Sequence, residues 1–334
     1  MAALSLASCL WPRKKAPPPP ADPRSRTPSP ARTLAFNELA AATSNFRDDL
    51  RIVREASLYK AYLKSVNQVV AIKLQRDRSS SEQLNKEFLA RVLTLSSLRH
   101  PNVVNHVGFC ADGHHRVLVH EYMTLSSLQN HLHDRSPGKA LLDWNTRMKI
   151  AAGVAKGLEY LHGKGVVYSK SMSSSDLLLG DGYHPKLSQY GLAELHQLLV
   201  AEEDEGLCTT VFTRSGNIIA PEMLFTGRVT TKSNVYSFGG VLLELITGRR
   251  PFDPAQAVAK DRDLVIWDRS QFRWMADPAL QDRYPPMDLH EALRVASMCI
   301  HQKPAMRSPI GAVAAALSRL ADHPPESSHH SAPH

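Results

Sequence analysis

Residues 144–162 read WNTRMKIAAGVAKGLEYLH, with apolar side chains at every third or fourth position. This is the spacing of one face of an α-helix, so the stretch predicts a long amphipathic helix. Small residues, among them Gly153 and Gly157, lie in the middle of the stretch and allow other segments to approach its backbone. We therefore expect this helix to pack closely against its neighbours.

The segments on either side of this helix differ in character. Residues 68–74 (QVVAIKL) and 117–122 (VLVHEY) are short runs rich in β-branched and apolar side chains, which is typical of strands. Between them, residues 82–98 have apolar side chains at helical spacing. Strands with one helix thus come first and helices follow, which predicts an α+β fold with two lobes. The later helices are expected over 235–247, 289–300 and 310–320.

The composition is that of an ordinary globular protein, because 43% of the 334 residues are hydrophobic and 22% are charged. A chain of this length can bury a sizeable core in one large domain or two lobes. The composition excludes a collagen, a coiled coil, a wholly disordered chain and a disulfide-stapled secreted fold. Its cysteines are scattered, so we expect no structural zinc and a reducing, intracellular compartment. They are Cys9, Cys110, Cys208 and Cys299.

The basic charge of the chain is concentrated at its N-terminus. Residues 1–35 contain six basic residues and one acidic residue, which accounts for +5 of the formal net charge of +8. Eight of the 22 prolines lie between Pro12 and Pro30, and proline cannot join a helix or a sheet ladder. The sequence therefore predicts a disordered basic arm over 1–35, a folded domain over 36–322 and a disordered tail over 323–334 that is rich in His, Pro and Ser. Because the charge lies in the arm and not on a basic patch of the body, we predict no nucleic-acid binding.

A membrane anchor is one interpretation of the arm. Cys9 precedes the basic run Arg13–Lys15, and a lipid on this cysteine would hold the chain at the plasma membrane. The alternative is an unmodified thiol. The apolar residues 1–11 are too few to span a membrane, and no charged segment precedes them, so we expect no signal peptide. We expect a cytoplasmic protein that is free or peripheral at the plasma membrane.

A series of short motifs follows the arm in a fixed order. They are Phe36-Asn-Glu-Leu-Ala-Ala-Ala-Thr-Ser-Asn-Phe46, Val70-Ala-Ile-Lys73, His100-Pro-Asn102, Leu142-Asp-Trp-Asn-Thr-Arg147, His184-Pro-Lys-Leu-Ser188, Ala220-Pro-Glu222, Lys232-Ser-Asn-Val-Tyr-Ser-Phe-Gly239, Glu244-Leu-Ile-Thr-Gly248 and Arg307. Together they resemble a protein kinase domain, and in detail a plant receptor-like cytoplasmic kinase of subfamily VII. The resemblance implies a small β-rich N-lobe with one long helix, over about 47–121, and a larger helical C-lobe, over about 124–321.

The resemblance also implies which residues would hold ATP. Lys73 stands at the position of the lysine that anchors the nucleotide phosphates. The carboxylate that normally holds this lysine falls on Arg91, which would repel Lys73 unless an anion lies between them. Glu87, one helical turn earlier, is the alternative partner. Further nucleotide-site positions are occupied by Ala71, Glu121 and Met123.

The glycine-rich loop that covers the phosphates in this family is missing. The corresponding residues 52–60 read IVREASLYK, and Gly108 is the first glycine of the chain. Such a loop needs glycine because its backbone must approach the phosphates closely and adopt conformations that other residues resist. We therefore expect no phosphate-covering loop.

The residues that carry catalysis in the family are replaced as well. Matching the motif residue by residue places Lys170 at the catalytic base, Met172 at the following lysine and Ser175 at a metal-binding asparagine. Gln189 stands at the metal-binding aspartate, whereas Mg²⁺ prefers anionic oxygen ligands. Asp176 is an unsuitable substitute, because it falls where the family has an apolar, inward residue.

Residues that support the fold in this family are retained, with one exception. Glu222 and Arg307 are expected to form a buried structural ion pair. Asn234, however, stands where the family has an aspartate that orients the catalytic loop.

Replaced catalytic residues and retained packing residues predict a pseudokinase, a kinase-like protein that is not an enzyme and requires no cofactor or metal. We expect a scaffold, decoy or regulator in receptor-kinase signalling, with receptor or cytoplasmic kinases as its protein partners. Two alternatives stay open. One is a weakly active or unorthodox serine/threonine kinase. The other is a nucleotide or anion sensor that binds ATP without Mg²⁺, in which Lys73, Arg91 and Lys170 converge on a phosphate.

Overall fold

The computed structural model describes residues 32–53, 57–75, 82–134, 140–168, 171–188, 192–194, 218–250 and 275–323. The chain divides into two units, Met1–Pro30 and Ala31–His334, and all described residues belong to the second unit. Residues 1–31 of the predicted arm and 324–334 of the predicted tail lie outside the described ranges, so their disorder stays a prediction.

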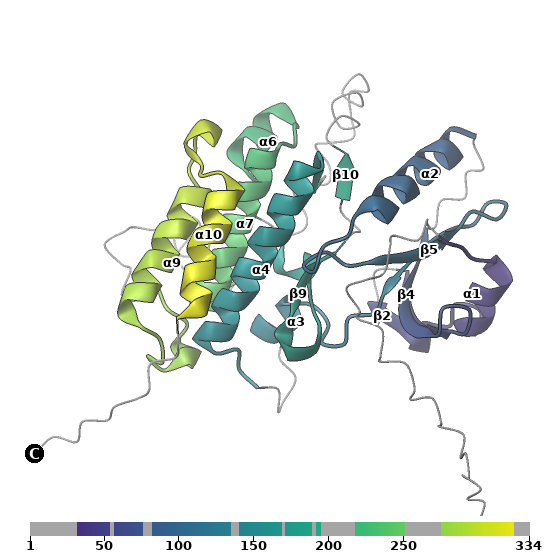
Figure 1. Ribbon diagram of the computed structural model, residues 1–334, viewed down its shortest axis with the longest axis horizontal. Coiled ribbons are helices and arrows are strands. Elements are labelled where there is room, and N and C mark those ends of the chain that lie inside the picture. The colour runs from purple at the N-terminus through teal and green to yellow at the C-terminus, as the bar shows by residue number, and fades with distance from the viewer. Residues whose placement is uncertain are drawn as a thin grey trace, which may run out of the picture. The chain divides into compact units, whose positions relative to one another are not determined.

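The N-terminal part of the second unit is a six-stranded sheet with two helices (Figure 1). Its strands are β1 (Arg32–Thr33), β2 (Arg51–Val53), β3 (Leu58–Leu63), β4 (Gln68–Gln75), β5 (His106–Cys110) and β6 (Arg116–Glu121). They lie in the order β1-β5-β6-β4-β3-β2, in which β1 is parallel to β5 and all other neighbours are antiparallel. The helices are α1 (Phe36–Ala42) and α2 (Glu82–Ser97), and a 3-10 turn, η1, covers Asp48–Leu50.

The two faces of this sheet differ in what they pack against. Val70 and Ile72 of β4 are fully buried in a hydrophobic cluster with Leu39 of α1. Successive side chains of a strand point to opposite faces, so Ala71 and Lys73 lie on the face away from α1. The alternation of β4 thus directs the predicted nucleotide residues toward one side of the sheet.

The first described strand begins four residues before the predicted domain boundary at residue 36. Arg32 and Thr33 pair with Gly108 and Phe109 of β5, and the Leu34 amide donates to the Phe109 carbonyl at 2.8 Å. This pairing satisfies backbone groups along an edge of β5 that would otherwise be exposed. Leu34 is then buried, with 3% of its surface exposed. The sequence missed this strand because two residues are too few to show a period.

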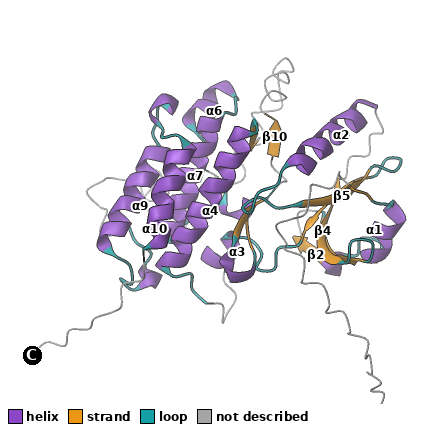
Figure 2. Ribbon diagram, in the orientation of Figure 1, coloured by secondary structure: helices purple, strands orange, loops and turns teal. Residues whose placement is uncertain are grey.

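The C-terminal part is mainly helical, as Figure 2 shows. Its helices are α3 (Gln129–Leu132), α4 (Trp144–Gly163), α6 (Pro221–Thr226), α7 (Thr231–Thr247), α9 (Pro286–Cys299) and α10 (Ile310–Asp322). Short strands pair as β7 (Val166–Tyr168) with β10 (Leu192–Glu194), and as β8 (Leu177–Leu179) with β9 (Pro185–Leu187). The 3-10 turns are η2 (Ser174–Asp176), η3 (Asp181–Tyr183), η6 (Pro278–Leu280) and η7 (Pro304–Met306). None of the helices in the described ranges is both long enough and apolar enough to cross a membrane.

The prediction of a two-lobed α+β fold is confirmed, and most predicted elements differ from the observed ones by a few residues. The largest difference is in α7, which begins at Thr231 and not at residue 235. Thr230 caps this helix, because its side chain accepts a hydrogen bond from the Ser233 amide at 3.0 Å. The polar first turn therefore belongs to the helix although it carries no apolar period.

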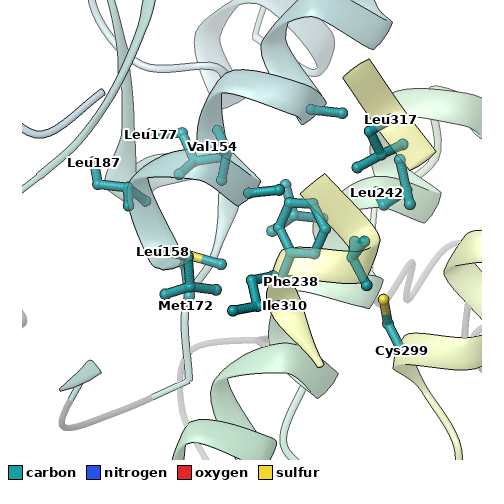
Figure 3. Close-up of a cluster of buried hydrophobic side chains, with 14 of the residues drawn as sticks. Val154, Leu158, Met172, Leu177, Leu187, Phe238, Leu242, Cys299, Ile310 and Leu317 are labelled. Atoms are coloured by element: carbon teal, nitrogen blue, oxygen red, sulfur yellow. The ribbon is translucent and has the colours of Figure 1, made fainter. Parts of the chain in front are cut away.

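The large hydrophobic core of the C-terminal part is built around α4 and α7. Leu158 of α4, Phe238 of α7 and Leu317 of α10 belong to one cluster of buried side chains (Figure 3). Two glycines of α4 allow the segments around Asn102 and Leu187 to lie directly on its backbone. A Cβ atom added at Gly157 would lie 2.7 Å from the Asn102 carbonyl oxygen and 2.9 Å from Leu187 Cδ1.

We expect Gly157→Ala to lower the free energy of unfolding by about 1–3 kcal/mol, because the added methyl group overlaps a backbone oxygen that cannot move alone. Gly163→Ala is the matched control. It is the last residue of the same helix, and an added Cβ atom would meet nothing within 4 Å. The control should be neutral or more stable, since alanine favours the helix. Urea unfolding of the two variants measures the difference, and equal stabilities would contradict the close packing.

Candidate active site

Lys73 lies on β4, an inner strand of the sheet that has β3 on one side and β6 on the other. It pairs with Leu58 on β3 and with Leu118 on β6, while Ala71 pairs with Lys60 and His120. Lys73 is half-buried and Ala71 is 6% exposed. Two of the predicted nucleotide residues therefore share one face of a continuous sheet.

Arg91 occupies the inner part of α2, next to the residues that dock this helix. Phe88 and Val92 are buried in the large core, and Arg91 beside them is half-buried. Desolvation by this burial lowers the pKa of the Arg91 guanidinium. Glu87, the alternative partner of Lys73, is exposed, and its Oε1 accepts a hydrogen bond from Gln83 Nε2 at 2.9 Å within the same helix.

The carboxylate of Glu121 connects β6 to a strand of the other lobe. Its Oε1 accepts hydrogen bonds from Lys186 Nζ on β9 at 2.6 Å and from the Asn105 amide at 2.7 Å. Met123, two residues later, is buried with 8% of its surface exposed. The side chain of Glu121 thus joins the two lobes.

Two of the site residues named from sequence cannot be placed. Lys170, at the catalytic-base position, and Gln189, at a metal position, lie outside the described residues. Their roles stay predictions.

Met172, at the catalytic-lysine position, is part of the hydrophobic core. It is 1% exposed and belongs to the same cluster as Leu158 and Phe238 (Figure 3). A thioether carries no charge and packs well in irregular apolar spaces. Met172 therefore contributes to stability, and at this position no cation is available for a phosphate.

The remainder of the catalytic loop is held by hydroxyl groups. Ser171 Oγ donates to the Ile218 carbonyl, and Asp176 Oδ2 accepts from both the amide and the hydroxyl of Ser173 at 3.0 Å. Ser175, at the asparagine position, is exposed, and its hydroxyl is hydrogen-bonded to Ser173 Oγ at 2.7 Å. Asp176 is buried and shapes η2, as expected for an inward position.

Of the two predicted metal-binding positions, only Ser175 lies in the described ranges, and its side chain does not suit magnesium. Ser175 offers only a neutral hydroxyl, whereas Mg²⁺ is normally held by carboxylates and phosphate oxygens. Within the described ranges, no three His, Cys, Asp or Glu side chains form a group that could hold a metal.

Sequence reasoning missed a buried polar network under the catalytic loop. Glu244 Oε2 accepts hydrogen bonds from Ser174 Oγ at 2.7 Å and lies 2.9 Å from His133 Nε2. The Glu244 side chain is 1% exposed and that of His133 is 4% exposed. Glu244 is the one charged residue in the otherwise apolar stretch 235–247, and this was the available signal. A charge is rarely buried without partners, so partners from other segments were to be expected.

The model of the protein tyrosine and serine/threonine kinase family matches residues 52–317, which is most of the chain. This chain belongs to the protein kinase family. Three plant kinases from Arabidopsis thaliana are similar to it over 87% of its length. The probable serine/threonine-protein kinase PBL7 is 50% identical over 301 residues, and the match covers 78% of that protein. The serine/threonine-protein kinases PBL27 and PBS1 are 50% and 49% identical, but the matches cover only 57% and 65% of their lengths.

These relatives contradict the prediction that this kinase-family chain is not an enzyme. Proteins that share half of its residues over some 300 positions are named serine/threonine-protein kinases. The prediction was wrong because it weighed single positions of the site. Phosphoryl transfer depends mainly on positioning and electrostatic stabilisation, to which the whole kinase domain contributes. Replacement of individual residues therefore does not exclude catalysis.

Glu222 and Arg307 of this kinase form a bidentate ion pair. Arg307 Nη1 and Nη2 donate to Glu222 Oε1 and Oε2 at 2.6 and 2.7 Å, and the Arg307 side chain is fully buried. The guanidinium also lies 4.7 Å from the centre of the Tyr236 ring. The pair joins the start of α6 to the segment before α10, which are 85 residues apart in sequence.

Proposed function

We propose that this chain is a serine/threonine protein kinase of the receptor-like cytoplasmic kinase class that transfers the γ-phosphoryl group of ATP to a serine or threonine hydroxyl. One observation carries the proposal: the chain is 50% identical over 301 residues to a protein named a probable serine/threonine-protein kinase. The retained Lys73, on a continuous sheet beside Ala71, supports the same conclusion.

The transfer is slow and unorthodox in this proposal. Phosphoryl transfer depends mainly on positioning and electrostatic stabilisation, so it can proceed at a lower rate when the hydroxyl loses its proton to water and not to a base of the protein. Among the described residues, Lys73 is then the main positive charge that binds the phosphates in this proposal. A positioned general base contributes about 10²–10⁴ to the rate of many reactions. We therefore expect a rate at least about 10² below that of the named relatives.

ATP is the proposed phosphate donor, and we infer that its binding does not require Mg²⁺. Support comes from the described part of the site, where Ser175 offers a neutral hydroxyl and Met172 is buried in the core. A thermal-shift titration with ATP, with and without Mg²⁺, measures this directly. Equal stabilisation in both series is expected, and a shift that appears only with Mg²⁺ would refute the inference.

Transfer from labelled ATP to a general protein substrate tests the proposed activity. Lys73→Ala should abolish the transfer, because it removes the cation that anchors the phosphates. Lys64→Ala is the matched control, since Lys64 is exposed at the β3–β4 turn and should keep the full rate. Equal transfer by the wild type and the Lys73 variant would point to a contaminating kinase. No transfer at all, with ATP still binding, would overturn the proposal in favour of a nucleotide or anion sensor.

The proposal extends to partners and location. Receptor kinases and cytoplasmic kinases are the proposed protein partners, and the names of the relatives support a place in protein phosphorylation. The organisation into an arm, a kinase domain and a tail is part of the proposal, with the domain beginning at residue 32 and not at residue 36. For location we propose the cytoplasm, and a lipid on Cys9 that would hold the chain at the plasma membrane stays the alternative to an unmodified thiol.

A further inference from the structure

A row of lysines lies along the exposed side of α4. Lys149, Lys156 and Lys164 follow one another at intervals of seven and eight residues, and all three are exposed. With about 3.6 residues per turn, these intervals return to nearly the same side of the helix. The helix rises about 1.5 Å per residue, so the part of the row from Lys156 to Lys164 is about 12 Å long.

The segment after α2 adds a further cation beside the C-terminal half of this row. The Arg99 amide donates to the Tyr160 hydroxyl at 2.9 Å, and the His100 ring stacks on the Tyr160 ring with 4.9 Å between their centres. Lys164 Nζ lies 6.0 Å from the centre of the same tyrosine ring. Tyr160 thus joins the two segments in one surface. We call this surface, formed by Lys156, Tyr160, Lys164, Arg99 and His100, the α4 ridge.

The cations of the α4 ridge have no acidic partner in the part of the chain that the structure describes. Within those ranges, none of the ion pairs includes Lys156, Lys164 or Arg99. Burial lowers the pKa of His100 below its usual value, although the charge of nearby Glu159 acts in the opposite direction, so this ring adds no charge at neutral pH. The ridge therefore carries three positive charges that attract an anionic group.

The sequence contains one segment with the matching charge. Glu202-Glu-Asp-Glu205 is the longest run of consecutive acidic residues in the chain, and it lies outside the described ranges. Four residues of extended chain cover about 13 Å, which is close to the length of the row from Lys156 to Lys164. The acidic run therefore matches the ridge in both charge and length.

The connection to the acidic run is long enough for docking within one molecule. Glu194, the last described residue before the run, pairs with Val166 of β7, which follows Lys164 by two residues. The Cα atom of Lys156 is at most about 21 Å from that of Val166, and paired strands are about 5 Å apart. The eight residues from Glu194 to Glu202 can span up to about 28 Å, so the ridge is within reach.

We propose that the α4 ridge is an intramolecular docking surface for the acidic segment Glu202–Glu205 of the same chain. Docking attaches the connection between β10 and α6 to α4 through several charge pairs. Each exposed ion pair is weak by itself, so the docking depends on several pairs together and weakens at high salt. This inference goes beyond the proposed function, because it requires no phosphate transfer.

Hydrogen exchange of the full chain tests the docking at low salt. Lys156→Glu combined with Lys164→Glu should speed exchange of the amides at 200–207 at least about fivefold, because exchange follows the undocked fraction. Glu202→Lys combined with Glu205→Lys should have the same effect. All four changes together restore opposite charges across the contact and should slow the exchange again. About 1 M NaCl should remove the protection in the wild type, since it shortens the Debye length to about 3 Å.

Lys64→Glu combined with Lys303→Glu is the matched control. Both lysines are exposed and belong to the β3–β4 turn and to the segment before η7, not to the ridge, so the net charge changes equally. Exchange at 200–207 should then stay as in the wild type. If the control and the ridge variant speed it equally, or if the four changes together fail to slow it, charge pairing with the ridge is refuted.

Carbodiimide coupling of the wild type identifies the partner of the acidic run. The reagent links a lysine amine to a carboxylate in contact with it, and we expect links from Lys156 or Lys164 to residues 202–205. In a mixture of light and isotope-labelled chains, links within one chain support the proposal, whereas links between chains overturn it in favour of contact between two copies. Absence of both refutes the contact. Should the Glu variants fail to fold, this coupling remains the test, and none of these measurements depends on the proposed function.

Discussion

Replacement of Arg307 by leucine is expected to lower the free energy of unfolding by about 3–5 kcal/mol, the range for breaking a buried ion pair. The fully buried guanidinium donates to both oxygens of Glu222 and to three backbone carbonyls. Leucine removes all of these donors at once and leaves the Glu222 carboxylate without its cation. Urea unfolding followed by tryptophan fluorescence measures the loss.

The exposed pair of Arg294 and Glu291 on α9 provides the control. It is also bidentate, through Nε and Nη2 of Arg294 at 2.7 and 2.6 Å, but the two side chains are 48% and 33% exposed. Solvent screens such a pair, so Arg294→Leu should cost no more than about 1 kcal/mol. Arg307→Lys should give an intermediate loss, because an ammonium cannot bond both oxygens in the same plane. If Arg307→Leu were as stable as Arg294→Leu, burial would not be the source of the effect.

Acidification from pH 7.5 to 5.0 is expected to destabilise the fold through two buried histidines. Burial lowers the pKa of His106 to about 4, with a smaller effect from the charge of Arg99, and burial lowers the pKa of His162 to about 4. The usual value is 6.5. Above pH 6.5 these imidazoles are neutral in both the folded and the unfolded chain, so they do not lower the free energy of unfolding there.

The direction of the effect follows from proton uptake. Below pH 6.5 the unfolded chain binds protons at these two positions and the folded chain does not, so stability falls until the pH reaches the folded value of about 4. Each histidine contributes about 1.4 kcal/mol per pH unit in this window. At pH 5.0 the pair therefore costs about 4 kcal/mol.

A single substitution separates this effect from the titration of other groups. His106 is 5% exposed on β5, and His106→Leu should reduce the loss of stability between pH 7.5 and 5.0 by about 2 kcal/mol. His114→Gln, which changes an exposed histidine in the turn before β6, should leave the loss as in the wild type. Identical pH dependence of the wild type and His106→Leu would show that His106 is not held neutral.

Local spacing in the sequence was sufficient to place the main elements. The helical period of 144–162 matches α4, and the β-branched run at 68–74 matches β4, each with a difference of one residue at one end. Such patterns are reliable because the period is imposed by the backbone geometry of the element itself. The cap at Thr230 and the strand Arg32–Thr33 carry no period, and they were missed.

The sequence by itself determined which chemical groups this kinase domain carries: no glycine before Gly108, and Lys170, Ser175 and Asn234 at positions where the family resemblance predicts other residues. It also identified the family by the order of its motifs. The tertiary structure alone decided what these groups touch: Met172 lies in the core, and Asn234 holds both backbone groups of Tyr168. The type of residue at a position is read directly from the sequence. A contact between residues 66 positions apart depends instead on how the helices and strands pack around a common core.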